Sequence, residues 1–336
     1  MAATTVLVTG ASGFVGLALA EHLLARGDRV VGYDLAAPPP AARRAFAALP
    51  GRFDAVAGDV RDAAALGRVL RDHAVERIVL LAAITADAAR ERAMPQAILE
   101  VNVGGVLAAL DAAAGAGVGR VVLGSSGSVY GAAGYATTPL DERDTPLRPE
   151  GLYGISKQAA EAAAARLAAL HGIDLRTGRL GTCFGPWEAA TGVRDTLSAP
   201  WQVLHHARHG RAVRLPRDSR RDWLYVRDAA AALAALLDAP SPPAPVYHLA
   251  AGFEWSLSQW CERVAAWHPG FAWRIADDAD GDAGADGAAR IDCYAPRDRA
   301  PMSIRRLRAD TGFAPRFDLP EAAADFHAWL QATDRD

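Results

Sequence analysis

The chain has 336 residues, 51% of them hydrophobic and 22% charged, which is typical of a globular protein of two domains or of one domain with a large lobe. A formal net charge of −3 and scattered arginines give no electrostatic reason to expect binding to nucleic acid or to an anionic membrane. Three cysteines, far apart and without a Cys-x-x-Cys pair, argue against a disulfide framework and a zinc ribbon, and we expect no metal site.

Short β-branched runs alternate with alanine-rich stretches in the first half of the chain. The expected strands are 6–9, 29–33, 53–57, 77–82 and 120–124, and the expected helices are 14–26, 63–73, 94–114 and 153–171. This alternation predicts an α/β fold with a parallel sheet covered on both faces. The three prolines at 38–40 are expected to form a loop. After about residue 180, proline, tryptophan and arginine become frequent, and the acidic, glycine-rich segment 276–289 is expected to be an exposed loop.

A glycine-rich turn follows the first expected strand and opens the first expected helix. Thr9–Gly16 has glycines at 10, 13 and 16, which permit a tight turn and close approach of a pyrophosphate to the helix N-terminus. Asp34 ends the second expected strand, where a carboxylate accepts hydrogen bonds from adenine-ribose hydroxyls and repels a 2′-phosphate. This pattern favours NAD over NADP and predicts a Rossmann-type, doubly wound sheet. Asp59-Val60 and Leu81-Ala82-Ala83 end two further strands and can either meet the cofactor or serve ordinary packing.

Lys157 is the only lysine of the chain, since the other 35 of the 36 basic residues are arginine. It follows Tyr153 by four residues in an expected helix, so the two side chains share a helix face. An ammonium group there can favour the ionised form of the phenol, which creates a general base. A lone Tyr-x-x-x-Lys is common by chance, so this interpretation depends on the rest of the sequence. Serines 125 and 126 end the fifth expected strand, where a hydroxyl can contact a substrate oxygen or simply form a turn.

Taken together, the motifs resemble the extended short-chain dehydrogenase/reductase family, of the NAD-dependent sugar epimerase/dehydratase type. The matching pieces lie between about positions 4 and 230: Thr9–Gly16, Asp34, Asp59-Val60, Leu81–Ala83, Asn102-Val103, Ser125–Gly131, Tyr153–Lys157, Gly185-Pro186 and Arg221–Val226. The resemblance implies that hydride passes from a substrate carbon to NAD while Tyr153 takes the hydroxyl proton. It implies that Lys157 activates Tyr153 and that Ser126 holds the reacting oxygen.

The same resemblance yields a set of expected site residues. The catalytic residues expected are Ser126, Tyr153 and Lys157. The cofactor-binding residues expected are Gly10, Ser12, Gly13, Phe14, Val15, Gly16, Asp34, Asp59, Val60, Leu81, Ala82, Ala83, Asn102, Tyr153, Lys157 and Leu180. The substrate-binding residues expected are Thr85, Ser126, Ser128, Thr182, Arg194, Arg221 and Arg297. The three arginines can grip a diphosphate or a carboxylate, or form ordinary surface ion pairs.

Two departures from the family pattern narrow the activity. The dehydratase branch has an Asp-Glu pair directly after the catalytic hydroxyl, whereas this chain has Gly127 and Ser128, so dehydration is not expected. Thr182 stands where nucleotide-sugar enzymes usually carry asparagine, which weakens the case for a nucleotide sugar. The leading expectation is an NAD-dependent epimerase or oxidoreductase acting on a nucleotide sugar. The alternatives are a dehydrogenase of a free sugar, sugar acid or small polyol and, less favoured because Lys157 is kept, a catalytically silent NAD-sensing protein.

The remaining expectations concern organisation and location. Residues 1–180 with about 221–250 are expected to form the NAD-binding domain, and 181–220 with 251–336 a smaller C-terminal α/β lobe that binds the substrate. In the family, long alanine-rich helices such as 94–114 and 153–170 pair across a two-fold axis, so a homodimer is expected. The sequence shows neither a signal peptide nor a transmembrane run, and a cytoplasmic location is expected.

Overall fold

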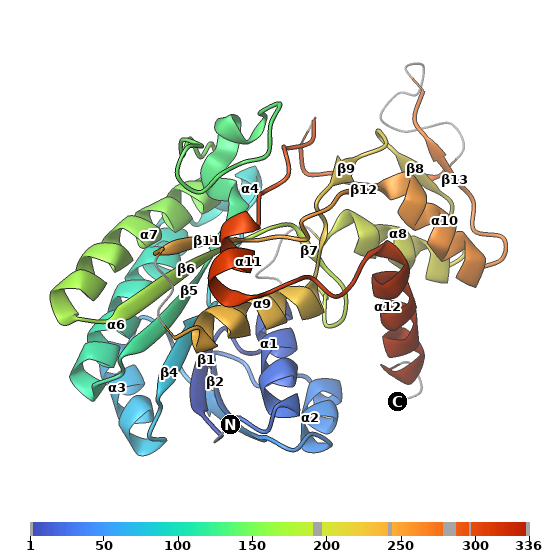
Figure 1. The fold of residues 1–336 in the computed structure, drawn as a ribbon. Helices are drawn as coiled ribbons and strands as arrows, with labels where there is room; N and C mark the ends of the chain where they lie inside the picture. The colour runs from blue at the N-terminus through green and yellow to red at the C-terminus, as the bar shows by residue number, and fades with distance from the viewer. Residues whose placement is uncertain (1–2, 191–196, 241–243, 278–286, 296, 334–336) are drawn as a thin grey trace.

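A computed structural model of the chain describes residues 3–190, 197–240, 244–277, 287–295 and 297–333. Its centre is a seven-stranded sheet with the order β11-β6-β5-β4-β1-β2-β3, in which all neighbouring strands are parallel (Figure 1). The strands are β1 Thr5–Thr9, β2 Arg29–Asp34, β3 Arg52–Ala57, β4 Arg77–Leu80, β5 Arg120–Ser126, β6 Asp174–Leu180 and β11 Val246–Leu249. The predicted doubly wound fold is therefore confirmed.

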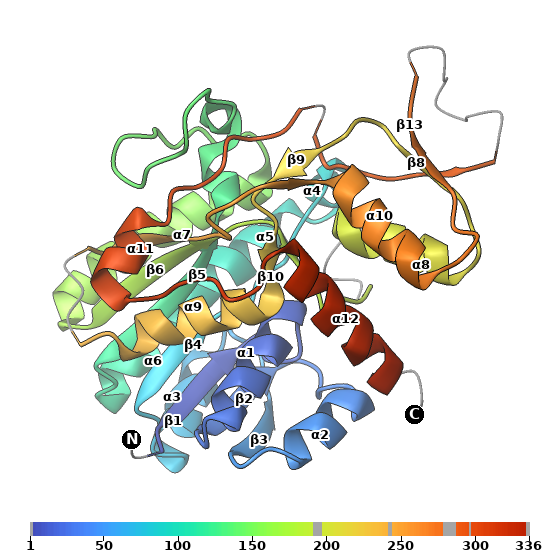
Figure 2. The same ribbon diagram turned by 45° about the vertical axis from the view of Figure 1, so that its right-hand side comes forward.

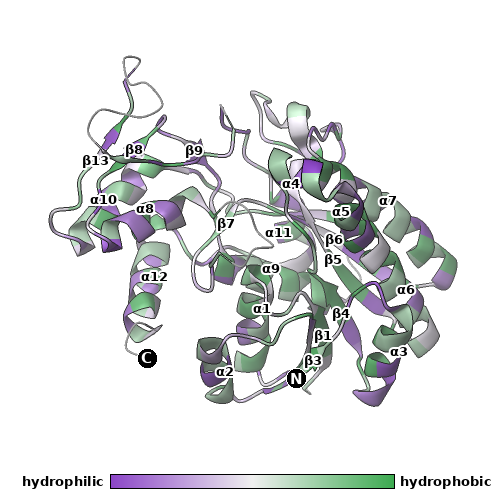
Figure 3. Cartoon of the chain, turned by 180° about the vertical axis from the view of Figure 1, so that it is seen from behind, coloured by the Kyte–Doolittle hydropathy of each residue, from purple (hydrophilic) through white to green (hydrophobic). Residues whose placement is uncertain are grey.

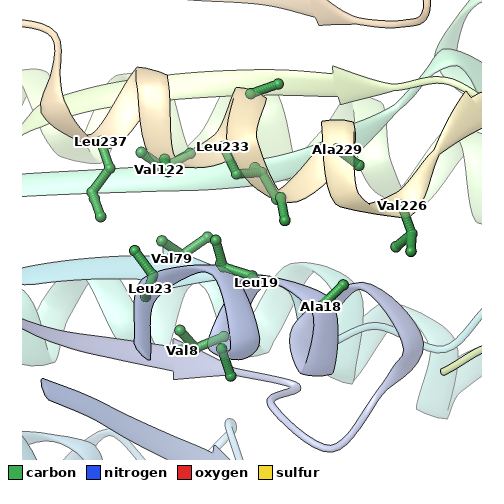
Figure 4. Packing of buried hydrophobic residues seen from close by; sticks show 14 of the residues in the cluster. Val8, Ala18, Leu19, Leu23, Val79, Val122, Val226, Ala229, Leu233 and Leu237 are labelled. Atoms are coloured by element: carbon green, nitrogen blue, oxygen red, sulfur yellow. The ribbon is translucent and has the colours of Figure 1, made fainter. Parts of the chain in front are cut away.

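Helices bury both faces of the sheet. One face is covered by α1 (Phe14–Ala25) and α9 (Val226–Asp238), whose apolar side chains meet those of the strands, as Figure 4 shows for Leu19, Leu23 and Leu233. The other face is covered by α3 (Ala63–Asp72), α6 (Gly105–Ala116) and α7 (Leu152–His171). Figure 3 shows the resulting concentration of hydrophobic residues in the central strands and in α1. Burial on both faces explains why these strands are continuous apolar runs instead of alternating ones.

The strand order reverses between β1 and β4. From β1 the chain moves outward through β2 and β3, and from β4 it moves the other way through β5 and β6. In open parallel sheets, ligands bind at the carboxyl ends of the strands beside such a reversal. The turn after β1 and the loops after β4, β5 and β6 therefore frame the candidate site.

A smaller group of elements lies to one side of the sheet (Figure 2). It contains a three-stranded parallel sheet of β8 (Val213–Leu215), β13 (Trp273–Ile275) and β14 (Ala289–Arg290), with the helices α8 (Ala199–Arg208), α10 (Leu257–Trp267) and α12 (Leu319–Thr333). The short strands β9 (Arg220–Arg221) and β12 (Trp255–Ser256) pair next to it, and β7 (Cys183–Phe184) pairs with β10 (Leu224–Tyr225). Seven tryptophans pack in or against its core: Trp201, Trp223, Trp255, Trp260, Trp267, Trp273 and Trp329.

The structure differs from the sequence-based expectations in several elements. The predicted helix 94–114 is present as a continuous helical stretch, Pro95–Ala116, but it contains a π-helical segment: α5 (Pro95–Leu99) is followed by η1 (Glu100–Gly104) and α6. Pro40 starts the helix α2 (Pro40–Ala47), since a proline is tolerated in a first turn, and α4 (Ala88–Ala93) was not predicted. The helix α11 (Arg305–Thr311) packs against β11 of the large sheet, so this segment does not belong with the lobe to which it was assigned.

One helical stretch of the described residues, Pro95–Ala116, is long and apolar enough to cross a membrane by length and composition. It packs on the sheet as a core helix: Val106, Ala109, Leu110 and Ala113 belong to the cluster between the sheet and α3, α6 and α7.

Candidate active site

The glycine turn after β1 is packed too closely for any other residue. Gly10 has a φ of +68°, and a Cβ there would lie 2.7 Å from the backbone nitrogen of Ala82, just beyond β4. A Cβ on Gly16, in the first turn of α1, would lie 2.1 Å from the Gly10 carbonyl oxygen. No side chain caps the N-terminus of α1 at Gly13. The turn therefore joins β1, α1 and the end of β4 and leaves a backbone surface suited to a phosphate.

Asp34 lies beside this turn. Its carboxylate accepts a hydrogen bond of 3.0 Å from the Ser12 amide and one of 3.2 Å from the Ala36 amide. The Ser12 hydroxyl donates to the Ala36 carbonyl at 2.7 Å, which ties the end of β2 to the glycine turn. Remaining lone pairs of the carboxylate can accept from two ribose hydroxyls.

The Asp59 carboxylate is held by an exposed ion pair of 2.6 Å with Arg61, which lowers the pKa of the acid. Val60 packs over Gly105 at the start of α6, where a Cβ would lie 2.7 Å from the valine side chain. These two residues follow β3, next to the end of β2, where the Gly58 amide binds the Asp34 carbonyl at 2.9 Å. Their contact with a cofactor stays a prediction.

Lys157 points into the end of the sheet. Its Nζ donates a 2.6 Å hydrogen bond to the Gly124 carbonyl of β5, and the side chain is 5% exposed. Burial lowers the pKa of Lys157 to about 8, while the nearby Glu161 carboxylate works in the opposite direction. The ammonium group is therefore charged at neutral pH, yet it lies close to the pH at which it loses its proton.

Tyr153 starts the same helix, one turn before Lys157, and is half-buried. Gly154 brings this turn against the loop after β5, because a Cβ there would lie 2.6 Å from the Ser128 carbonyl oxygen. In that loop the Ser126 hydroxyl accepts a hydrogen bond from the Ser128 amide at 3.1 Å and lies 3.1 Å from the Ser128 hydroxyl. The three predicted catalytic residues thus come from two segments that touch. Gly154 was not singled out from the sequence.

Asn102 has a different environment from the one expected. It is 1% exposed in η1, its amide oxygen accepts from the Ile84 nitrogen at 2.7 Å, and its amide nitrogen donates to the Ile84 carbonyl and to the Ser156 hydroxyl. Ser156 in turn donates to the Tyr153 carbonyl at 2.8 Å. These bonds make Asn102 a positioning residue that links the loop after β4 to the first turn of α7. Direct contact with a cofactor stays a prediction.

A buried polar network that sequence reasoning missed lies behind the serines. Ser125 donates to Glu161 at 2.5 Å, and Glu161 forms an ion pair of 2.7 Å with Arg179 of β6. Arg179 also donates to the Tyr130 hydroxyl at 2.7 Å, and this hydroxyl lies 2.5 Å from Nε2 of His248. Burial lowers the pKa of His248 to about 4, so its ring is neutral and accepts from Tyr130. The network fixes β5, α7 and β6 relative to one another.

A small cavity adjoins the carboxyl ends of these strands. Thr182, Arg221, Asp222 and Arg299 line it, so two of the predicted substrate residues lie together. Arg221 is not a surface ion pair: it is buried and bound to Asp298 at 2.9 Å. Arg299 was not predicted, because its distance along the chain from the other site residues hides the contact.

The other predicted substrate residues are less close to one another. Arg297 is exposed, and its guanidinium carbon lies 4.2 Å from the centre of the Tyr135 ring. Thr85 lies in the loop after β4, and Leu180 ends β6 opposite Ser126 of β5. Arg194 falls outside the described residues. Among the residues that the structure describes, no group of three or more His, Cys, Asp or Glu side chains could hold a metal ion.

These features fit a dinucleotide. The pyrophosphate requires a backbone cradle without Cβ atoms, and Gly10 and Gly16 provide one because neither position has room for a side chain. The adenine ribose requires an acceptor at the end of β2, which Asp34 supplies. The nicotinamide end would then lie toward β5, where Lys157 is anchored.

Comparisons with known proteins agree with this geometry. Residues 6–250 match the model of the NAD dependent epimerase/dehydratase family. Among curated proteins, the chain is 34% identical over 190 residues to UDP-glucuronate 4-epimerase 3 of Arabidopsis thaliana, covering 54% of this chain and 43% of that protein. It is 26% identical over 343 residues to dTDP-glucose 4,6-dehydratase of Streptomyces antibioticus, covering 97% and 92% of the two chains. The matches to the first curated relatives span about half of those relatives' length.

Solved structures are similar over nearly the whole chain. MoeE5 in complex with UDP-glucose and NAD has a TM-score of 0.74 and 27% identity, covering 98% of this chain and 99% of that one. The same protein in complex with UDP-glucuronic acid and NAD has a TM-score of 0.75 and 26% identity, with the same coverage.

Proposed function

The chain belongs to the NAD dependent epimerase/dehydratase family, and from this premise we propose that it is an NAD-dependent epimerase acting on a hydroxyl of a nucleotide sugar. One observation carries the proposal. Lys157 is buried at the end of β5, one helical turn after Tyr153, while the glycine cradle lies against the end of the neighbouring strand β4. A base and a dinucleotide site thus share one edge of the sheet. The nucleotide-sugar substrate is supported by relatives that are named UDP-sugar epimerases and by MoeE5 with UDP-glucose.

In the proposed reaction, Tyr153 accepts the proton of the substrate hydroxyl as the carbon that bears it is oxidised to a ketone. A phenol is ordinarily protonated at neutral pH, so it needs a nearby cation to act as a base, and Lys157 is the charge on the same helix face. Ser126 donates a hydrogen bond to the reacting oxygen. Bound NAD would supply the reversible hydride acceptor. Return of the hydride to the opposite face of the ketone, with the proton from Tyr153, gives the epimer.

Thr182 favours a second candidate, a dehydrogenase of a free sugar, sugar acid or small polyol. It lines the cavity with a hydroxyl where nucleotide-sugar enzymes usually have a carboxamide, and its carbonyl is bound by the Leu224 amide. Such an enzyme would release the ketone and the reduced cofactor instead of returning the hydride.

Incubation with NAD and a substrate panel separates the two. The panel contains UDP-glucose, UDP-glucuronate, galacturonate and aldonates, and both NADH absorbance and sugar composition are followed. Interconversion of a UDP-sugar without stoichiometric NADH supports the epimerase. NADH formed in proportion to the oxidised free sugar or sugar acid supports the dehydrogenase. If no substrate of the panel reacts, both proposed activities are wrong.

Replacing Lys157 tests the proposed base. Lys157→Arg keeps the charge but places a bulky, planar group in a closed site, so we expect kcat to fall by about 100-fold, a typical contribution of general-base catalysis. NAD affinity, measured by calorimetry, should change little. Arg166→Lys, an exposed exchange on the same helix, is the matched control. Full turnover by Lys157→Arg would remove the role assigned to the amine.

A further inference from the structure

The cavity beside the proposed catalytic serine contains an arginine that forms no direct ion pair with a described residue. In the described part of the chain, the Arg299 guanidinium has no hydrogen-bond or ion-pair partner, although it lines the cavity with Thr182 and Asp222. Burial and the nearby charge of Arg221 both disfavour its charged form, while Asp222 favours it. An arginine nevertheless stays protonated in proteins. Burying this positive charge therefore costs free energy, and an anion that binds next to it would lower that cost.

Arg299 lies close to the residue that follows Ser126. A Cβ on Gly127 would lie 3.3 Å from the Arg299 Nη1 and 3.1 Å from the Met302 sulfur. The arginine stem passes over Gly134, where a Cβ would lie 2.8 Å from its Cδ, and the Ala300 amide binds the Gly134 carbonyl at 2.9 Å. The segment is thus anchored with its guanidinium a few ångströms from the loop that holds the proposed reacting oxygen.

The neighbouring charges do not satisfy Arg299. Arg221 is already paired with Asp298, which is also bound by Arg217 at 2.7 Å and by the Ser219 hydroxyl at 2.6 Å. Asp222 faces the same cavity, but its carboxylate accepts the Met302 amide at 2.9 Å. Among the described residues, neither Asp298 nor Asp222 forms an ion pair with Arg299 within 4.0 Å. The guanidinium fork is left open toward the cavity.

We propose that Arg299 receives a carboxylate on the carbon next to the reacting one, so that the preferred substrate is a nucleotide-linked uronic acid and not a neutral hexose. This proposal rests on the proposed function. If Ser126 holds the oxygen at the reacting carbon, a substituent on the adjacent ring carbon lies within reach of a group beside Gly127. A planar guanidinium binds a carboxylate through two parallel hydrogen bonds, which a neutral hydroxymethyl group cannot form.

Arg299 also lies beside position 127, where the dehydratase branch has an acidic residue. A Cβ on Gly127 would lie 3.3 Å from the Arg299 Nη1 and 3.1 Å from the Met302 sulfur. The site therefore holds a cation where a dehydratase of this family has an acid. MoeE5, which is similar over nearly the whole chain, is known in complex with UDP-glucuronic acid.

Kinetics on two substrates test the proposal. For the wild type we expect kcat/KM to be at least about 10-fold higher for UDP-glucuronate than for UDP-glucose. Arg299→Met should lower kcat/KM for UDP-glucuronate by about 10- to 100-fold, mainly through KM, and change that for UDP-glucose less than about 3-fold. Arg299→Lys should recover part of the loss. Arg305→Met, at an exposed arginine nearby, is the control. Equal losses for both substrates, or a wild-type preference for UDP-glucose, would overturn the proposal.

Binding separates this proposal from the proposed function. Calorimetry of NAD-loaded protein with UDP-glucuronate and UDP-glucose reports the preference even if neither sugar is converted. If neither sugar is converted but UDP-glucuronate binds more tightly and Arg299→Met abolishes this difference, the epimerase proposal is wrong and the carboxylate contact is supported. If the sugars are converted but bind equally well, the epimerase proposal is supported and the carboxylate contact is wrong. Thermal melting of each variant confirms that it is folded.

Discussion

At the scale of single residues, the buried ammonium group of Lys157 opposes folding. Its pKa is about 8 in the folded chain against an ordinary value of 10.5, because burial disfavours the charge. Between these two pH values the unfolded chain binds more protons than the folded one, so stability must rise with pH. The gap between the two pKa values corresponds to about 3 kcal/mol of penalty at neutral pH. No other lysine exists to obscure the effect.

Urea unfolding of the cofactor-free protein measures this penalty. We expect the free energy of unfolding of the wild type, relative to Lys157→Met, to increase by about 2 kcal/mol between about pH 7 and about pH 10. The comparison with the methionine variant cancels the titration of tyrosines and cysteines. A difference that is constant over this range would show that the amine is solvated in the folded state.

Lys157 and Tyr153 could be predicted because their relation is local: a spacing of four on a helix is visible in the sequence. Arg299 could not be, because its contact with Gly127 joins distant parts of the chain. Nor could the ion pair of Arg179 with Glu161, since both residues are unremarkable in sequence and only the packing of β6 on α7 brings them together.

At the scale of elements, the π-helical η1 interrupts the helix that the sequence predicts as continuous. The apolar residues of this segment have the spacing of a continuous helix. A π-helical turn contains one extra residue, and the amino-acid composition does not indicate where it occurs. The effect is to direct Asn102 into the protein, where it bonds both backbone groups of Ile84 and the Ser156 hydroxyl. One local irregularity thus connects the cofactor-side loop to the helix that carries Tyr153.

Removing the Asn102 amide tests this connection. Asn102→Ala leaves the Ile84 amide and carbonyl without partners, so we expect it to lower the free energy of unfolding by about 2–3 kcal/mol. Because the loop after β4 loosens, NAD affinity should also fall several-fold. Gln96→Ala removes an exposed hydrogen bond of the preceding turn to Glu100 and should cost less than about 0.5 kcal/mol. Urea unfolding measures the stability of both variants, and calorimetry measures their NAD affinity. Equal losses in the Asn102→Ala and Gln96→Ala variants would contradict the positioning role of Asn102.

At the scale of the whole molecule, the sequence predicted the α/β class, because strand ends and glycine turns carry local signals. The same signals indicate the carboxyl ends of the strands as the place of the candidate site. The helix α9 and the strand β11 pack with the large sheet, and the division into two domains stays a prediction. The return of α11 to the same sheet was missed. Leu307 of α11 and Phe313, just after this helix, join the core beside α1 and α9. No motif distinguishes such a segment from one that packs in the lobe.

The helices α5 and α7 leave apolar side chains on the surface of the sheet's helical layer. Leu99 is 41% exposed on α5 and Ile155 is 42% exposed on α7, and these two helices contact each other. In the most apolar 18-residue window of the stretch Pro95–Ala116, to which Leu99 belongs, 44% is buried within one chain. A second copy that brings its own α5 and α7 onto this face would cover both residues, because a two-fold axis sets a patch against itself.

We therefore expect a homodimer in solution, measured as twice the chain mass by light scattering after size exclusion. The double variant Leu99→Glu/Ile155→Glu should be monomeric at micromolar concentration, since burying four carboxylates at a symmetric contact is strongly unfavourable. Ile275→Glu, at a residue of equal exposure (41%) in the lobe, should remain a dimer. A wild type that runs as a monomer, or a double variant that stays dimeric with an unchanged melting temperature, would place the interface elsewhere or remove it.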